Sequence, residues 1–157
     1  MPGFPGGRPG PVAPPMVEFV AVVSDPKGGK SYQTKVAGHL ANSLVGKRIG
    51  EEVDGIFVQL PGYKLKITGG TDRSGFPMIA DLPGTRYRRL LVTEGTGFKA
   101  RSRHKKKKDK PLHERGLRKK KPLRGNTVSP ETAQVNFKIT THGAKAIGEL
   151  LKPEERK

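Results

Sequence analysis

The chemically most distinctive side chains in this sequence form a basic run at residues 99–124, KARSRHKKKKDKPLHERGLRKKKPLR. The run holds fourteen Lys and Arg against two acidic residues, Asp109 and Glu114, so its net charge is +12, out of +17 for the whole chain. Lys offers a compact point charge and Arg a planar fork, and both bind phosphate oxygens. The run therefore predicts a segment that binds a polyanion, with nucleic acid as the first candidate.

Two other interpretations of the basic run fit it less well. A membrane-surface segment needs an amphipathic helix or a lipid anchor, and here Pro111, Gly116 and Pro122 prevent a long helix. A solvated loop without a partner is the ordinary explanation of a charged run, but it leaves the size of this charge unexplained. We expect an extended, flexible loop that joins two strands and folds onto a phosphate lattice. Base readout should be weak, because Phe98 is the only flanking aromatic candidate for stacking.

The predicted nucleic-acid-binding residues are the cations of this run together with basic residues on the strands around it. If they neutralise about 6–10 phosphates, affinity should fall about 10³–10⁵-fold between about 50 and 200 mM salt. The set is Lys64, Lys66, Arg73, Arg86, Arg88, Arg89, Lys99, Arg101, Arg103, Lys105, Lys106, Lys107, Lys108, Lys110, Arg115, Arg118, Lys119, Lys120, Lys121 and Arg124.

Two short motifs partly match known ligand-binding loops, one for nucleotide phosphates and one for calcium, but neither has all the residues that its ligand requires. KGGKS (27–31) matches the end of a phosphate-binding P-loop, but the first glycine would fall on Ser24, Pro26 offers no N–H, and an alternating strand follows instead of a helix. GTDRSG (70–75) resembles a fragment of a calcium loop but lacks the further acids at the required spacing. We interpret both as tight turns.

No arrangement of residues predicts catalysis or a bound cofactor. The four histidines are scattered, and none pairs at helical spacing with another ligand. The acidic cluster of Glu51, Glu52 and Asp54 lies among glycines, where a solvated loop is expected. The chain has no cysteine, which excludes disulfides and thiol chemistry. The sequence therefore predicts a binding protein and not an enzyme, without metal, cofactor or small-molecule substrate.

The elements that must hold the basic run are short strands with few helices. Alternating or Val-rich stretches predict about six strands, and the absence of long helices between them favours an antiparallel barrel or sandwich. A helical turn is expected near residues 40–45, another at 128–133, and a short amphipathic helix at 143–151. The predicted strands are 17–24, 31–37, 56–60, 63–68, 86–92 and 134–140.

Composition divides the chain into three parts. Residues 1–15 are expected to form a Pro/Gly-rich N-terminal extension, residues 16–142 a β-barrel domain with the basic RNA-binding loop 99–124 inserted between strands, and residues 143–157 a short helix and tail. No stretch holds the roughly 18 apolar residues of a membrane span, and the N-terminus has no apolar signal region. We therefore expect a cytoplasmic protein without a membrane partner.

Four stretches resemble one known family. KRIGEEVDG (47–55), LPGYKLKITGGTDRSGFPM (60–78), RRLLVTEGTGFK (88–99) and LRGNTVSPETAQVNFKI (123–139) are similar to small-subunit ribosomal protein six of the archaeal and eukaryotic type. The resemblance implies a small antiparallel β-barrel bound to small-subunit ribosomal RNA beside neighbouring ribosomal proteins, with no catalytic residues. Eukaryotic members carry a long C-terminal helix with phosphorylated serines. Since this chain has no Ser-rich tail, it is closer to the archaeal form.

These observations together predict a structural constituent of the small ribosomal subunit that binds ribosomal RNA through a polycationic loop on a β-barrel. A DNA-compacting or other general nucleic-acid-binding protein is the alternative. A third possibility is a nucleic-acid enzyme or a translation factor that has lost its active site.

Overall fold

The first two strands form a β-hairpin. In the computed structural model, which describes residues 17–100 and 116–151, β1 (Glu18–Asp25) pairs antiparallel with β2 (Lys30–Ala37). The turn between them contains Gly29 at φ 63°, a backbone conformation that glycine adopts without steric cost. The prediction of a hairpin here, and not a P-loop, is confirmed.

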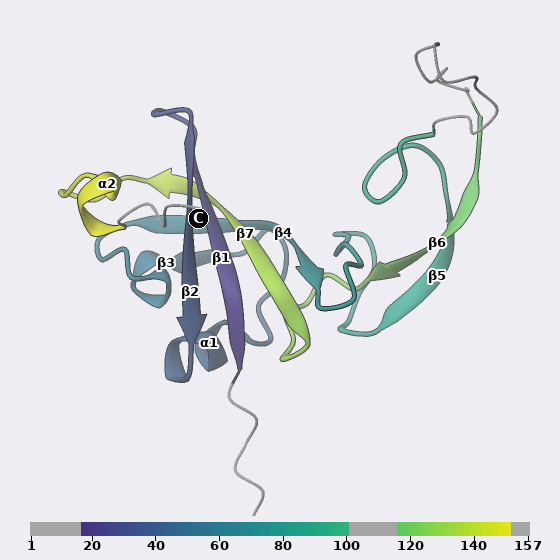
Figure 1. Ribbon diagram of the computed structural model, residues 1–157, viewed down its shortest axis with the longest axis horizontal. Coiled ribbons are helices and arrows are strands. Elements are labelled where there is room, and N and C mark those ends of the chain that lie inside the picture. The colour runs from purple at the N-terminus through teal and green to yellow at the C-terminus, as the bar shows by residue number, and fades with distance from the viewer. Residues whose placement is uncertain (1–16, 101–115, 152–157) are drawn as a thin grey trace, which may run out of the picture.

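A five-stranded sheet carries the core. Its order is β2-β1-β7-β4-β3, where β7 (Thr132–Thr141) is parallel to β1 and antiparallel to β4 (Lys64–Asp72), and β3 (Glu52–Asp54) forms an edge (Figure 1). Alternate residues of the central strands point into the core. Among the largest buried side chains are Phe19, Leu65, Ile67, Val135 and Phe137.

The predicted β-barrel is wrong, although the chain is mostly strands with few helices. In the part of the chain that the structure describes, the sheet stays open with β2 and β3 as its edges. Two short helices lie where strand pairing would have closed it: α1 (His39–Leu44) contacts β2, and the 3₁₀ helix η1 (Gly55–Val58) contacts both α1 and β2. Their apolar residues join the core that the sheet leaves open.

The predicted strand at 56–60 is the η1 helix and the turn that follows it. The amide of Leu60 donates to the Gly55 carbonyl at 2.8 Å, and Gln59 has a left-handed backbone at φ 63°. A Cβ at Gly55 would lie 2.2 Å from the Leu60 carbonyl oxygen, so only glycine fits this tight turn. The turn buries Val58 and Leu60 completely. Apolar content alone could not distinguish this buried turn from a buried strand.

A second, two-stranded sheet extends away from the first. It consists of β5 (Tyr87–Val92) and β6 (Lys119–Arg124), which curve away from the five-stranded sheet as a ribbon (Figure 1). β5 was predicted, whereas β6 lies inside the run expected to be a flexible loop. Lysine is disfavoured in strands, so a run of three lysines gave no strand signal.

Smaller differences concern where individual strands and helices begin and end. Residues 69–72, which were expected in a loop, continue β4. The helical turn predicted at 128–133 is a non-helical turn at residues 130–131. The C-terminal helix α2 (Ile147–Leu150) is shorter than predicted. The N-terminal extension 1–15 lies outside the described residues. None of the helices in ranges 17–100 and 116–151 is long and apolar enough to cross a membrane.

Tyr63 ties the start of β4 to the C-terminal segment. Its hydroxyl donates to the Lys145 carbonyl, and its ring contacts His142 edge-on with 6.0 Å between ring centroids. Burial raises the pKa of the Tyr63 phenol above 10, and the negative charge of Asp25 adds to this effect.

Replacing Tyr63 with Phe should lower the free energy of unfolding by about 1 kcal/mol at neutral pH, because one buried hydrogen bond is lost. The raised pKa of Tyr63 stabilises the folded state fully below pH 10, and this contribution is lost as the pH rises through the higher folded-state pKa. The stability difference between wild type and Tyr63→Phe should therefore shrink above pH 10 in urea unfolding. A difference that stays constant with pH would contradict this assignment. Lysines also titrate above pH 10, but they affect both proteins equally and so do not contribute to the difference between the two unfolding free energies.

Candidate nucleic-acid interface

Cations cover both faces of the two-stranded ribbon. Residues directly opposite each other share a face, and the register pairs Arg89 with Pro122 and Leu91 with Lys120 on one face. On the other face, Arg88 is opposite Leu123 and Lys121 is opposite Leu90. Each face therefore carries a pair of like charges at diagonal positions, Arg89 with Lys120 on the first face and Arg88 with Lys121 on the second. Residues at such diagonal positions are typically about 7–8 Å apart.

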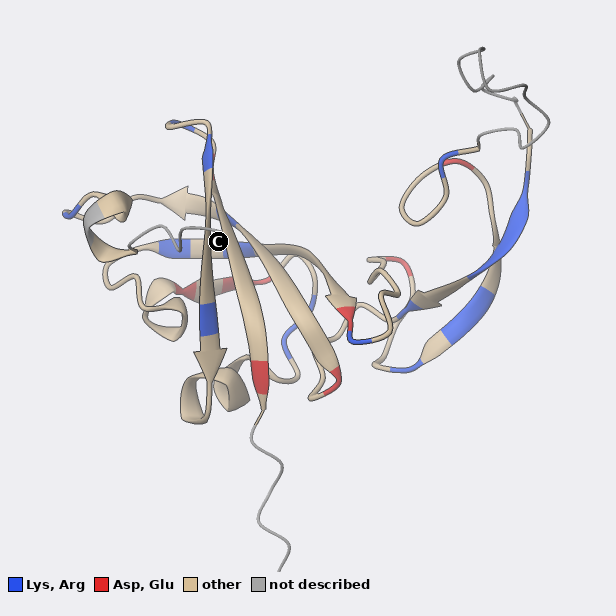
Figure 2. Cartoon of the chain, in the orientation of Figure 1, with Lys and Arg blue, Asp and Glu red and all other residues tan. Residues whose placement is uncertain are grey.

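The positive charge extends beyond the paired residues. We call residues 86–100 and 116–124 the basic ribbon; it holds nine Lys and Arg and one acidic residue, Glu94. Figure 2 shows the blue stretches following both of its strands. Eight of the nine cations are exposed or half-buried, so they can reach a partner: Arg86, Arg88, Arg89, Lys99, Arg118, Lys119, Lys120 and Lys121.

Eight further predicted residues belong to the connection between the two strands of the ribbon. They lie outside the described residues, and each of them stays a prediction. They are Arg101, Arg103, Lys105, Lys106, Lys107, Lys108, Lys110 and Arg115.

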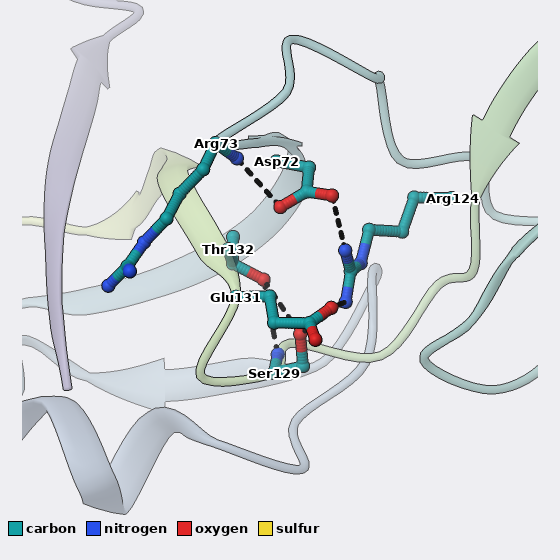
Figure 3. A network of polar contacts seen from close by, with 6 residues as sticks. All are labelled: Asp72, Arg73, Arg124, Ser129, Glu131 and Thr132. Atoms are coloured by element: carbon teal, nitrogen blue, oxygen red, sulfur yellow. Dashed lines mark hydrogen bonds and ion pairs between the residues drawn. The ribbon is translucent and has the colours of Figure 1, made fainter. Parts of the chain in front are cut away.

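Three predicted residues lie outside the basic ribbon, two of them on the main sheet and one in the turn that follows β4. Lys64 and Lys66 are exposed on β4, directly opposite Asp54 and Glu52 of β3, so acidic neighbours partly compensate their charge. Arg73 follows β4 and is exposed; in Figure 3 its side chain points away from Asp72 and Arg124. The structure therefore does not bring Lys64 and Lys66 together with the basic ribbon. The backbone of Arg73 does lie at the root of the ribbon, where its amide donates to the Glu131 carbonyl at 3.3 Å.

Tyr87 is a candidate nucleic-acid contact that the sequence analysis missed. It is 60% exposed at the start of β5, between Arg86 and Arg88, and its ring lies 5.9 Å from that of Phe76. An exposed aromatic ring among cations is a platform on which a base can stack. The signal was present in the stretch RYRR (86–89), outside the run in which stacking residues were sought.

Arg124 differs from every other described cation of the basic ribbon because it is buried. It is 3% exposed, and its guanidinium contacts acceptors from two elements. One terminal nitrogen donates to the carboxylate of Asp72 at the end of β4, and the other donates to Glu131 and, at 2.9 Å, to the Ser129 hydroxyl (Figure 3). Among the described residues its Nε has no hydrogen-bond partner.

The backbone around Arg124 reinforces the same junction. Its amide donates to the Pro77 carbonyl at 2.9 Å, and its carbonyl accepts from the Ile79 amide at 3.1 Å. Asp72 is itself 8% exposed and accepts a hydrogen bond from the Arg73 amide. Arg124 thus fixes the root of the basic ribbon to the main sheet, and its charge is compensated inside the protein.

Comparisons with known proteins agree with one another. Residues 19–152 match a family described as "Ribosomal protein S6e". The chain is 46% identical over 140 residues to the small ribosomal subunit protein eS6 of Archaeoglobus fulgidus, covering 88% of this chain and 99% of that protein. It is 44% identical over 142 residues to that of Methanocella arvoryzae, covering 90% and 92%. The protein of the same name from Methanococcus maripaludis is 44% identical over 130 residues, covering 83% and 93%.

Proposed function

We infer the function from the premise that this chain belongs to the ribosomal protein S6e family. It is a structural, non-enzymatic constituent of the small ribosomal subunit, located in the cytoplasm, and the family predicted from four sequence stretches is confirmed. We propose that it binds small-subunit ribosomal RNA through the basic ribbon and the connection 101–115. Neighbouring ribosomal proteins are further proposed partners.

The observation that carries this proposal is the charge on both faces of the basic ribbon. A two-stranded ribbon is only marginally stable by itself, and like charges close together weaken it further. Arg88 with Lys121 and Arg89 with Lys120 are such pairs, and within the ribbon only Glu94 is acidic. A polyanion that contacts both faces would turn this repulsion into attraction. Ribosomal RNA supplies that charge in the particle to which the family belongs.

Four of the predicted contacts are not part of the proposed surface. Lys64, Lys66 and Arg73 remain predicted contacts outside the ribbon, while Arg124 is left out of the proposed contacts because of its burial. The alternative of a DNA-compacting protein receives no support from the relatives, which carry a ribosomal name.

Replacing Lys119, Lys120 and Lys121 with Gln tests the described part of this surface. We expect affinity for small-subunit ribosomal RNA to fall about tenfold at about 150 mM salt, and the slope of log affinity against log salt to flatten by about 2, because three phosphate contacts are lost. Filter binding over a series of salt concentrations measures both quantities.

The matched control replaces Lys27, Lys30 and Lys145 with Gln, which removes the same charge from exposed positions on the main sheet and its C-terminal connection. This control should leave the slope nearly unchanged. Equal flattening in the two triple variants would mean that net charge, and not the basic ribbon, determines binding. A wild-type protein that stays at the top of a sucrose gradient while small subunits migrate without it would contradict the assignment as a whole.

A further inference from the structure

An open pocket lies at the root of the basic ribbon, where the start of β5, the end of β6 and the turn before β7 meet. The lining combines a cation, an aromatic ring, a proline and a carboxylate, with two buried polar groups behind them. The lining includes Arg86, Tyr87, Arg124, Ser129, Pro130 and Glu131.

One wall of this pocket is suited to a planar base. Tyr87 is 60% exposed, and its contact with the Phe76 ring, at an angle of 36° between the two planes, orients it. Pro130 is exposed and adds a second rigid apolar surface. Base stacking on an aromatic side chain contributes to single-stranded RNA binding for every base, so this wall supplies affinity without selectivity.

The carboxylate of Glu131 is the unusual member of the lining. Its side chain is 74% exposed at the root of a surface otherwise suited to phosphates, which a carboxylate repels. Arg124 cancels only part of this charge, because the same guanidinium is also paired with Asp72 and therefore serves two carboxylates. The hydrogen bond from Arg124 uses one acceptor position of Oε2 and holds the group in place, so Oε1 and the second lone pair of Oε2 remain available to a ligand. A carboxylate fixed in this position can accept hydrogen bonds from a ligand that presents donors.

We propose that this pocket binds one unpaired guanine nucleotide of the RNA. The base stacks on Tyr87, its adjacent N1–H and N2–H donors bond the Glu131 carboxylate, and Arg86 binds a neighbouring phosphate. Guanine is selected because it alone presents two adjacent donors on its Watson–Crick edge. Uracil presents one, and adenine and cytosine each place an acceptor nitrogen beside their amino group, facing the carboxylate. The inference rests on the proposed function, since it specifies one subsite of the RNA-binding surface.

The test uses the full chain and four RNA hairpins that differ only in one bulged nucleotide, G, A, C or U. Wild-type protein should bind the G-bulged hairpin about tenfold more tightly than each of the others, which is within the discrimination expected of a bidentate contact. In Glu131→Gln the preference should fall to less than about twofold, while affinity for the other three hairpins is unchanged or higher. Tyr87→Ala should weaken binding of all four hairpins by a similar factor, on the order of tenfold.

Glu52→Gln is the matched control, because it makes the same charge change at an exposed position of β3. It should keep the full preference for guanine, and loss of the preference in this variant would overturn the inference. Equal binding of all four hairpins by the wild type would also overturn it while leaving RNA binding intact. No binding of any hairpin would overturn the proposed function and the inference together. If Glu131→Gln fails to fold, the affinities of the wild-type protein for the four hairpins still test whether guanine is preferred.

Discussion

Replacing residues 101–115 with a short Gly-Ser linker is expected to weaken binding to small-subunit ribosomal RNA about a hundredfold or more at about 150 mM salt. The replaced segment carries eight Lys and Arg against Asp109 and Glu114. If each of the eight cations neutralises one phosphate, the slope of log affinity against log salt should flatten by about 6. This is the largest effect on binding that the chain offers, because the segment holds about half of the charge proposed to contact RNA.

The same replacement should leave the fold nearly intact. The core of the main sheet is formed by residues such as Phe19, Leu65 and Phe137, which come from strands remote from the replaced segment. Shortening a loop changes its closure entropy only slightly. We therefore expect a thermal unfolding midpoint close to that of the wild type, measured by circular dichroism.

A linker of the original length distinguishes lost charge from altered geometry. A Gly-Ser replacement of all fifteen residues should give the same flattened salt slope as the short linker. An unchanged slope in both variants would show that the strands of the ribbon, or another surface, make the phosphate contacts.

The sequence predicted β1, β2, β4 and β7 of the main sheet because their two sides have different environments. It missed the short edge strand β3, whose residues Glu52 and Asp54 were expected in a solvated loop. Leu65 and Ile67 alternate with Lys64 and Lys66, and burial follows the same alternation in the structure. The closure of the sheet could not be predicted in this way. It depends on whether the edge strands β2 and β3 meet, and α1 and η1 occupy that position instead. Local alternation carries no information on such a contact.

The position of the positive charge could be predicted from the sequence, but the role of each charged residue could not. Composition alone placed most of the positive charge between 99 and 124, and the described cations of that segment are exposed or half-buried except Arg124, which is buried. Arg124 could not be told from its neighbours, because its role depends on Asp72 and Glu131, which come from other parts of the chain. An arginine becomes structural through its partners, and these are known only once the strands are assembled.

The structural role of Arg124 leads to the second large prediction. Arg124→Ala should lower the free energy of unfolding by about 3–5 kcal/mol, because it leaves the buried carboxylate of Asp72 without its counter-charge. Arg124→Lys should lose part of the same stability, since an ammonium group cannot hold Asp72, Ser129 and Glu131 in the geometry of a planar fork. Urea unfolding at neutral pH measures these differences.

Arg88→Ala is the matched comparison, because Arg88 lies on the partner strand of the same ribbon and is exposed. Its free energy of unfolding should stay within about 0.5 kcal/mol of the wild type. Similar small losses in Arg88→Ala and Arg124→Ala would mean that the ion pair with Asp72 does not hold the ribbon.

The salt dependence of RNA binding should change in the variant of Arg88 and not in the variant of Arg124, which is the reverse of the expected changes in stability. Arg88→Ala should reduce the salt slope for RNA by somewhat less than 1, because one phosphate contact is lost. Arg124→Lys, studied at a temperature where it remains folded, should lower affinity through a less firmly oriented ribbon but leave the slope unchanged, since its charge is already compensated by Asp72 and Glu131. A reduced slope in Arg124→Lys would place Arg124 among the RNA contacts after all. Stability and salt dependence thus assign two arginines of one ribbon to two roles, one that positions the charged surface and one that forms it.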